Sequence, residues 1–215
     1  MAAVYDGFIS RKINRKLSEP VARMLARTRL TPNQATWGAF AVAALSFMSF
    51  ALGHNILGGI LAQLASIADG IDGSLARLKG MTSAFGSFLD SVLDRYADVL
   101  IVLGMTLWSL SHEGYPQVWL VGFLAVAGTL SVSYTRARLD PKYRLIFDRG
   151  LASVASRDVR LFLIMLGGVL GQVYFCLLLI AILTNLVIFY RLFFGYRYLK
   201  RRPKSDGSTS GRLSK

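Results

Sequence analysis

The sequence predicts an all-α integral membrane protein, in which six transmembrane helices follow an amphipathic helix on the membrane surface. The chain has 215 residues, 53% of them hydrophobic, and a mean hydropathy of +0.46, which is well above that of a typical soluble domain. Apolar runs long enough to cross a bilayer recur along it. All 25 lysine and arginine residues fall in segments that six spans place on one side, and this is the cytoplasmic side by the positive-inside rule.

The segment before the first span, residues 1–32, is predicted to be a cytoplasmic juxtamembrane region. Within residues 9–29, apolar side chains such as Leu17, Val21 and Met24 recur at helical spacing among basic ones. This pattern favours an amphipathic helix lying on the inner leaflet. A solvated basic arm is the alternative, because Pro20 stands in the middle of the pattern.

The six spans form a predicted transmembrane domain over residues 33–202. They are expected near residues 33–53, 55–76, 86–110, 117–135, 156–171 and 173–197. Thr31 can cap the first span and Pro32 suits its first turn. A glycine-rich turn around Gly171 separates the last two spans, because that apolar stretch is too long for one helix. Residues 203–215 lack apolar anchors and are expected to form a disordered tail, so that both termini lie in the cytoplasm.

Four aspartates interrupt the apolar second and third spans: Asp69, Asp72, Asp90 and Asp94. Spacings of three and four residues place each pair on one face of its helix. A short turn makes the two helices antiparallel neighbours, so the four carboxylates are expected to converge near the cytoplasmic side. Ionised residues at membrane depth each cost on the order of 2.5–3.5 kcal/mol. Two divalent cations would balance four such charges, and oxygen ligands favour Mg²⁺, or Mn²⁺ in its place.

Small residues accompany these carboxylates. Gly70, Gly73, Ala76 and Gly86 leave room for a ligand to approach the backbone, and Arg77 follows directly after them. Metal ions, an arginine and a trough of small residues together favour a nucleotide diphosphate as ligand.

Residues 69–94 fit every fixed position of the pattern D-x2-D-G-x2-A-R-x8-G-x3-D-x3-D, and the chain resembles the CDP-alcohol phosphotransferase family. The resemblance implies six transmembrane helices, an amphipathic helix before them and a homodimer. It also implies an enzyme of phospholipid or polyol-phosphate biosynthesis. Such an enzyme transfers a phosphate-linked group from a CDP-activated donor to the hydroxyl of a small alcohol acceptor and releases CMP.

The resemblance also implies roles for the motif residues. Asp94 would be the catalytic base. The metal ligands would be Asp69, Asp72, Asp90 and Asp94. The CDP moiety would be bound by Asp69, Gly73, Ala76, Arg77 and Gly86.

The acceptor is predicted from softer signals. The stretches DGFISRKINR and FGSFLDSVLDRYAD resemble family members that use inositol phosphate. Four arginines near helix ends are candidate ligands of the acceptor's phosphate: Arg136, Arg138, Arg157 and Arg160. Arg157 and Arg160 are expected to face one pocket, with Asp158 turned away. Snorkelling to anionic lipid is the alternative role for these arginines.

Other functions stay open at this point. Membrane carboxylates also mark cation transporters, and the same enzyme class includes acceptors such as glycerol phosphate, serine and ethanolamine. The donor could be CDP-diacylglycerol, CDP-archaeol or a CDP-polyol. Contact with membrane lipids explains the net charge of +13, so we expect no nucleic-acid partner. Asp98 continues the acidic stripe one turn deeper and is expected to support the site or to pair helices.

Overall fold

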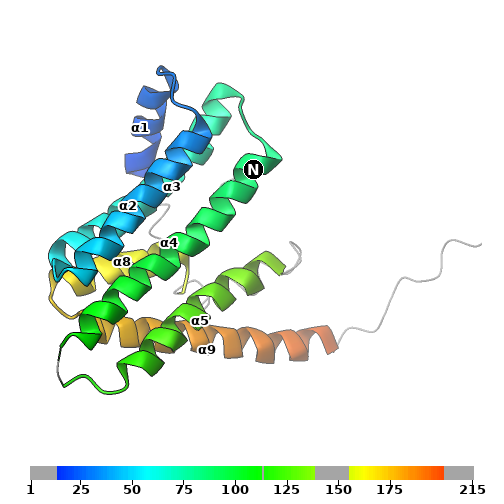
Figure 1. The fold of residues 1–215 in the computed structure, drawn as a ribbon. Helices are drawn as coiled ribbons and strands as arrows, with labels where there is room; N and C mark the ends of the chain where they lie inside the picture. The colour runs from blue at the N-terminus through cyan, green and yellow to red at the C-terminus, as the bar shows by residue number, and fades with distance from the viewer. Residues whose placement is uncertain (1–13, 113, 139–154, 201–215) are drawn as a thin grey trace, which may run out of the picture.

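The computed structural model describes residues 14–112, 114–138 and 155–200, and within these ranges the chain forms helices and no strands (Figure 1). The described helices are α1 (Arg15–Ala26), α2 (Pro32–Ala51), α3 (Asn55–Lys79), α4 (Ala84–Leu110), α5 (Val118–Arg138), α8 (Arg157–Val169) and α9 (Val173–Lys200). The predicted tail, residues 203–215, lies outside the described residues, as does the beginning of the predicted amphipathic segment.

Four of these helices are long and apolar enough to cross a membrane, namely α2, α3, α5 and α9, and they identify an integral membrane protein. The other two predicted spans correspond to α4 and α8. α4 is long enough at 27 residues, but it carries Asp90, Asp94, Arg95 and Asp98. α8 has 13 residues, or about 20 Å at the usual helical rise, and is shorter than the predicted 156–171.

The ends of the helices follow from local sequence. Thr31 caps α2 in a capping box with Gln34, and Pro32 occupies the first turn, as predicted. α3 ends at Gly80, whose φ of 64° is left-handed, a conformation in which glycine carries no steric penalty. Ser83 then caps α4 by accepting a hydrogen bond from the Gly86 amide. This short turn joins α3 to α4, but the two helices do not pack along each other as predicted, because α2 packs against both of them.

Close helix packing brings α8 against α3. A Cβ atom on Gly168 of α8 would lie only 2.5 Å from the Asn55 carbonyl oxygen and 3.0 Å from Gly59 Cα of α3. Glycine at the crossing therefore allows the two backbones to touch, as small residues do in membrane helix pairs. The main apolar core includes Phe50 of α2, Ile101 of α4 and Leu177 of α9.

The amphipathic helix α1 is docked on α3 by buried polar contacts. Asn14, which immediately precedes α1, donates to Ser66 Oγ at 2.9 Å and accepts from Gln63 Nε2 at 3.0 Å. Lys79 Nζ donates to the carbonyls of Thr28 and Leu30 and so fixes the α1–α2 connection to the end of α3.

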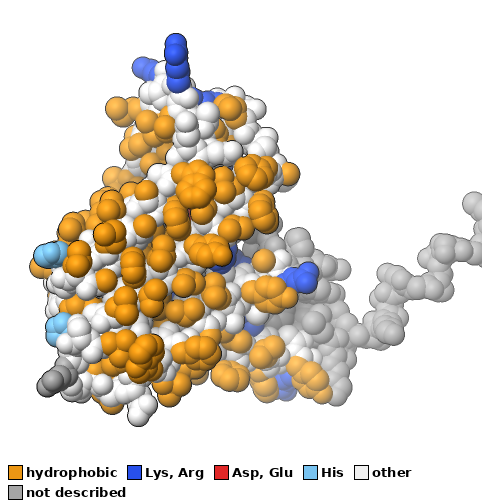
Figure 2. Space-filling view, in the orientation of Figure 1, with side chains coloured by type: hydrophobic (Ala, Val, Ile, Leu, Met, Phe, Trp, Pro, Cys, Tyr) orange, Lys and Arg blue, Asp and Glu red, His pale blue; other side chains and the backbone are white. Residues whose placement is uncertain are grey.

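Large apolar side chains cover much of the exterior, and Figure 2 shows them over most of one face of the molecule. They include Leu17 and Met24 of α1, at 50% and 71% exposure. An apolar exterior of this extent is expected where lipid replaces water. α1 is thus a helix with exposed apolar side chains, which is compatible with the predicted place on the membrane surface.

Candidate active site

Aspartates from α3 and α4 meet at one point. Asp69, Asp90 and Asp94 each present a carboxylate oxygen, and these three atoms lie within 4.8 Å of one another. Asp69 comes from α3 and the other two come from successive turns of α4, so the helical spacing in the sequence produces this cluster.

Asp72 stands next to the cluster and has its own partners. It is 6% exposed. Its Oδ2 accepts a hydrogen bond from Thr36 Oγ1 of α2 at 2.6 Å, and its Oδ1 accepts from the Gly73 amide. The threonine therefore holds the carboxylate in one orientation. Thr36 was not among the predicted site residues. A polar residue one turn inside an apolar span could have indicated a role in the site.

The cluster fits a divalent cation. Mg²⁺ binds oxygen ligands at about 2.1 Å, so opposite ligands lie about 4.2 Å apart. Adjacent ligands of such an octahedral ion lie about 3 Å apart, and only one pair of three ligands can be opposite. The Asp69, Asp90 and Asp94 oxygens, all within 4.8 Å of one another, would therefore draw closer together around a bound ion. The donors are all carboxylates and are neither fully buried nor fully exposed, which suits a hard cation that also keeps water or substrate oxygens.

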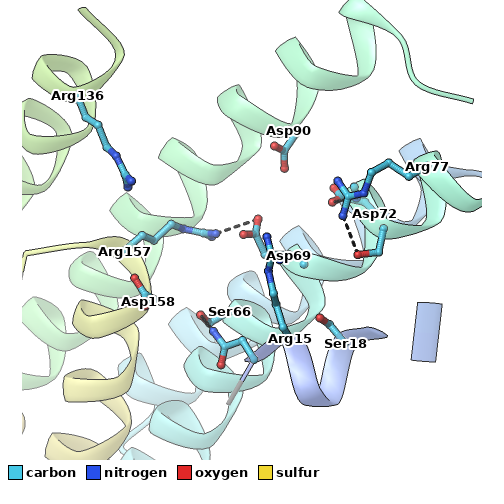
Figure 3. Close-up of a pocket in the computed structure, with 14 residues that line it drawn as sticks. Arg15, Ser18, Ser66, Asp69, Asp72, Arg77, Asp90, Arg136, Arg157 and Asp158 are labelled. Carbon is cyan, nitrogen blue, oxygen red and sulfur yellow. Dashed lines mark hydrogen bonds and ion pairs between the residues drawn. The ribbon is translucent and has the colours of Figure 1, made fainter. Parts of the chain in front are cut away.

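A cavity of about 300 Å³ opens beside the cluster. Figure 3 shows its lining side chains, which come from α1, α3, α4, α5 and α8. Asp69, Asp72 and Asp90 line it on the acidic side, and Arg136 and Arg157 line it as well. The cavity is therefore lined by both carboxylates and guanidinium groups.

The four candidate arginines separate into two pairs. Arg136 and Arg157 line the 300 Å³ cavity. Arg138 does not line it and donates to the Tyr134 hydroxyl at 3.3 Å on its own helix. Arg160 is 5% exposed and is paired with Asp98. Arg157 and Arg160 thus do not share this cavity. Asp158, expected to turn away, lines it, because the first turn of α8 faces α3.

Arg157 crosses from α8 to the acidic cluster. Its NH1 lies 2.9 Å from Asp69 Oδ1 and 3.0 Å from Asp94 Oδ1, and its Nε lies 3.0 Å from Asp98 Oδ1. The guanidinium therefore supplies positive charge to the carboxylates from a helix distant in sequence.

A second cavity of about 200 Å³ adjoins the first. It is lined by four of the five positions expected to bind the CDP moiety: Gly73, Ala76, Arg77 and Gly86. The fifth, Asp69, lines the first cavity instead. A Cβ atom on Gly86 would lie 3.0 Å from Ser83 Oγ and 3.3 Å from Asn33 Oδ1, so a side chain there would fill the space. Asp72, Gly73, Arg77 and Asp90 line both cavities and form their common wall.

The amphipathic helix contributes to the first cavity, and this contribution was not predicted from the sequence. Asn14, Arg15 and Ser18 line it, and Figure 3 shows Arg15 extending toward Asp69. The position of α1 beside the cavity depends on contacts between residues far apart in the sequence, and no local sequence pattern indicates such contacts.

Comparisons with known proteins agree with this site. Residues 29–196 match the sequence model of CDP-alcohol phosphatidyltransferase. The chain is 43% identical over 180 residues to the "bifunctional IPC transferase and DIPP synthase" of Rubrobacter xylanophilus, covering 84% of this chain and 40% of that protein. It therefore spans about two fifths of that relative's length. It is 34% identical to the archaetidylinositol phosphate synthase of Pyrococcus horikoshii, covering 85% of this chain and 94% of the relative.

The fold also matches a solved structure. The crystal structure of Mycobacterium tuberculosis phosphatidylinositol phosphate synthase with CDP-DAG bound superposes with a TM-score of 0.67 at 20% identity, covering 83% of this chain and 92% of that one. At this identity the likeness concerns the fold alone. Together with the match over residues 29–196, the two sequence relatives and the aspartate motif show that the chain belongs to the CDP-alcohol phosphatidyltransferase family.

Proposed function

We propose that this chain transfers a phosphate-linked group from a CDP-activated lipid or polyol to the hydroxyl of inositol phosphate and releases CMP. The observation that carries the proposal is the meeting of three carboxylates beside two adjoining cavities. One cavity is lined by motif positions for CDP. The other is lined by four arginines, two of which, Arg136 and Arg157, are candidate ligands of the acceptor's phosphate. The relatives from R. xylanophilus and P. horikoshii are named as synthases of inositol-containing phosphates or lipids, which supports this acceptor.

The proposed metal ligands are Asp69, Asp72, Asp90 and Asp94, with two Mg²⁺ ions, or Mn²⁺ in their place. Bound there, the ions would neutralise the diphosphate and improve CMP as a leaving group. Thr36 would keep Asp72 oriented through its 2.6 Å hydrogen bond. Gly73, Ala76, Arg77 and Gly86 would hold the cytidine and its phosphates in the 200 Å³ cavity.

Asp94 is the proposed general base. Its side chain is 18% exposed, and its Oδ1 lies 3.0 Å from Arg157 NH1. It would take the proton of the acceptor hydroxyl while that oxygen bonds to the donor's β-phosphorus. The bond between that phosphorus and the bridging oxygen then breaks, and the electron pair leaves with CMP.

The acceptor is proposed to bind in the 300 Å³ cavity. Arg136 and Arg157 line it, and a pair of guanidinium groups favours a phosphate-bearing acceptor such as inositol phosphate or glycerol phosphate. We therefore propose that phosphorylated polyols are better acceptors than serine or ethanolamine.

We further propose that α4 and α8 complete six spans over residues 33–202, with both termini and the aspartates on the cytoplasmic side. The carboxylates of α4 keep it out of the set of helices that are apolar enough to span a membrane, but these side chains face the interior of the protein rather than lipid. The placement of all 25 basic residues on one side in the six-span arrangement supports the orientation. A homodimer is proposed from the family resemblance, with membrane lipids as further partners and no nucleic acid.

The test is CMP release by the purified full chain in nanodiscs. CDP-diacylglycerol, CDP-archaeol and CDP-inositol are each combined with inositol phosphate, glycerol phosphate, serine or ethanolamine, with and without Mg²⁺. We expect CMP release with inositol phosphate that chelation by EDTA abolishes and Mg²⁺ restores. Asp94→Asn should remove the activity while the melting temperature and elution volume stay unchanged.

The matched control is Glu19→Gln, the same carboxylate-to-amide change at a residue of α1 whose side chain is 50% exposed. It should leave CMP release unchanged. Absence of CMP with every donor and acceptor, or metal flux across proteoliposomes in place of transfer, would refute the proposed enzyme.

A further inference from the structure

Asp98 is a buried carboxylate that holds two guanidinium groups. It is 3% exposed and lies one turn beyond Asp94 on α4. Its Oδ1 accepts from Arg157 Nε at 3.0 Å, and its Oδ2 accepts from Arg160 NH2 at 2.7 Å. Asp98 lines neither of the two cavities, and it is not one of the three carboxylates that form the cluster.

Arg160 gives this carboxylate a fixed support. Its NH1 donates to the Ala155 carbonyl at 2.7 Å, and the residue is 5% exposed. Its guanidinium is therefore held both by the chain just before α8 and by α4. Because two buried charges and a backbone carbonyl define its place, the Asp98 oxygens have little freedom to move.

Arg157 projects from this support toward the cavity. Asp98 holds its Nε, and Asp69 and Asp94 hold its NH1. Among the described residues, its NH2 has no hydrogen-bonding partner. A guanidinium is planar, so fixing Nε and NH1 also fixes the direction of NH2. Arg157 itself lines the 300 Å³ cavity (Figure 3).

We propose that Asp98 is a positioning residue that acts through Arg157 to set the affinity for the acceptor's phosphate. This inference rests on the proposed function, because it assumes that a phosphorylated acceptor binds in the 300 Å³ cavity. Asp98 would hold the side of the guanidinium that faces away from the substrate. The competing view is that Asp98 only pairs α4 with α8 and serves folding.

The first test is Asp98→Asn. An amide offers one acceptor oxygen where the carboxylate offers two, so one of the two arginines then faces an NH2 group. We expect the KM for inositol phosphate to rise about tenfold, the effect of one weakened hydrogen bond to a charged group. The KM for the CDP-linked donor should stay within about twofold, which is the scatter of neutral changes. The contrast between the two KM values is the diagnostic result, because Arg157 also contacts the proposed base Asp94 and can alter kcat.

A second variant tests the idea with Asp98 intact. Arg157→Lys keeps a cation but lacks the Nε–H that Asp98 holds, and it preserves the Asp98–Arg160 pair. It should raise the KM for inositol phosphate about as much as Asp98→Asn. Arg23→Lys is the matched control, at an α1 arginine whose side chain is 70% exposed. If Arg157→Lys binds inositol phosphate like the unaltered enzyme, the proposal is wrong even where Asp98→Asn does not fold.

The double variant separates positioning from folding. If Asp98 acts through Arg157, adding Asp98→Asn to Arg157→Gln produces no further rise in this KM. The proposal would be overturned if the two substitutions had multiplicative effects on the KM for inositol phosphate, or if the KM for the donor rose in parallel. It would also be overturned if electron paramagnetic resonance showed weaker Mn²⁺ binding to Asp98→Asn. An unaltered enzyme that releases no CMP would instead refute the proposed function.

Discussion

Replacing Gly168 with alanine would place a methyl group at the α3–α8 crossing. The new Cβ would lie 2.5 Å from the Asn55 carbonyl oxygen and 3.0 Å from Gly59 Cα, whereas ordinary contacts begin at 3.4 Å. Both neighbours are backbone atoms, so no side chain can rotate away. α8 must therefore move from α3 by about 0.9 Å, and overpacking of this kind costs roughly 1–3 kcal/mol.

The same displacement reaches the site. Arg157 NH1 lies 2.9 Å from Asp69 Oδ1. If α8 moves as a rigid helix, this separation grows to about 3.8 Å, beyond the range of a hydrogen bond. We therefore expect Gly168→Ala to lower the melting temperature in detergent and to raise the KM for inositol phosphate.

Gly38→Ala is the matched control, because a Cβ atom there meets nothing within 4 Å. This change should be neutral or should stabilise α2 by up to about 1 kcal/mol through helix propensity. Differential scanning fluorimetry of both variants beside the unaltered chain gives the comparison. Equal melting temperatures for Gly168→Ala and Gly38→Ala would refute the close-crossing argument.

Two further predictions concern supporting contacts. Thr36→Val removes the donor to Asp72 and should weaken Mn²⁺ binding about tenfold, as outer contacts of metal ligands do. Ser109→Ala, which removes a hydroxyl bonded to Met105 O within α4, is the control in this titration, and equal Mn²⁺ affinities would contradict the role given to Thr36. Lys79→Met removes two hydrogen bonds to the α1–α2 connection and should accelerate tryptic cleavage at Arg27 and Arg29, since each bond contributes about 1 kcal/mol. Unchanged cleavage, compared with an exposed control Lys16→Met, would show that Lys79 does not restrain this segment.

Much of the α3–α4 pair could be predicted because its determinants are local. Helical spacing predicted the shared face of Asp90 and Asp94. The short turn was also expected to pair α3 with α4 along their length, but both helices pack against α2 instead, and they come together at the aspartate cluster. The Thr31 cap and the turn at Gly171 were also predicted, and the structure confirms both. These features depend on residues within one or two turns of each other, where spacing and capping rules apply.

The partners of the site depend on contacts between distant segments. Arg157 and Asp98 are 59 residues apart, and nothing near either one indicates that they meet. The packing of α8 against α3, where Gly168 meets Gly59, likewise has no local sequence signal. The sequence spacing of Arg157 and Arg160 predicted a shared pocket, but burial against α4 took Arg160 away from it.

The wall common to the two cavities affects how kinetic data on this enzyme can be read. Asp72, Gly73, Arg77 and Asp90 each border both compartments, so a change at any of them disturbs two ligands at once. Saturation curves for the nucleotide and for the polyol should then shift together. Only positions confined to one compartment, such as Gly86 on one side and Arg136 on the other, can report on a single substrate.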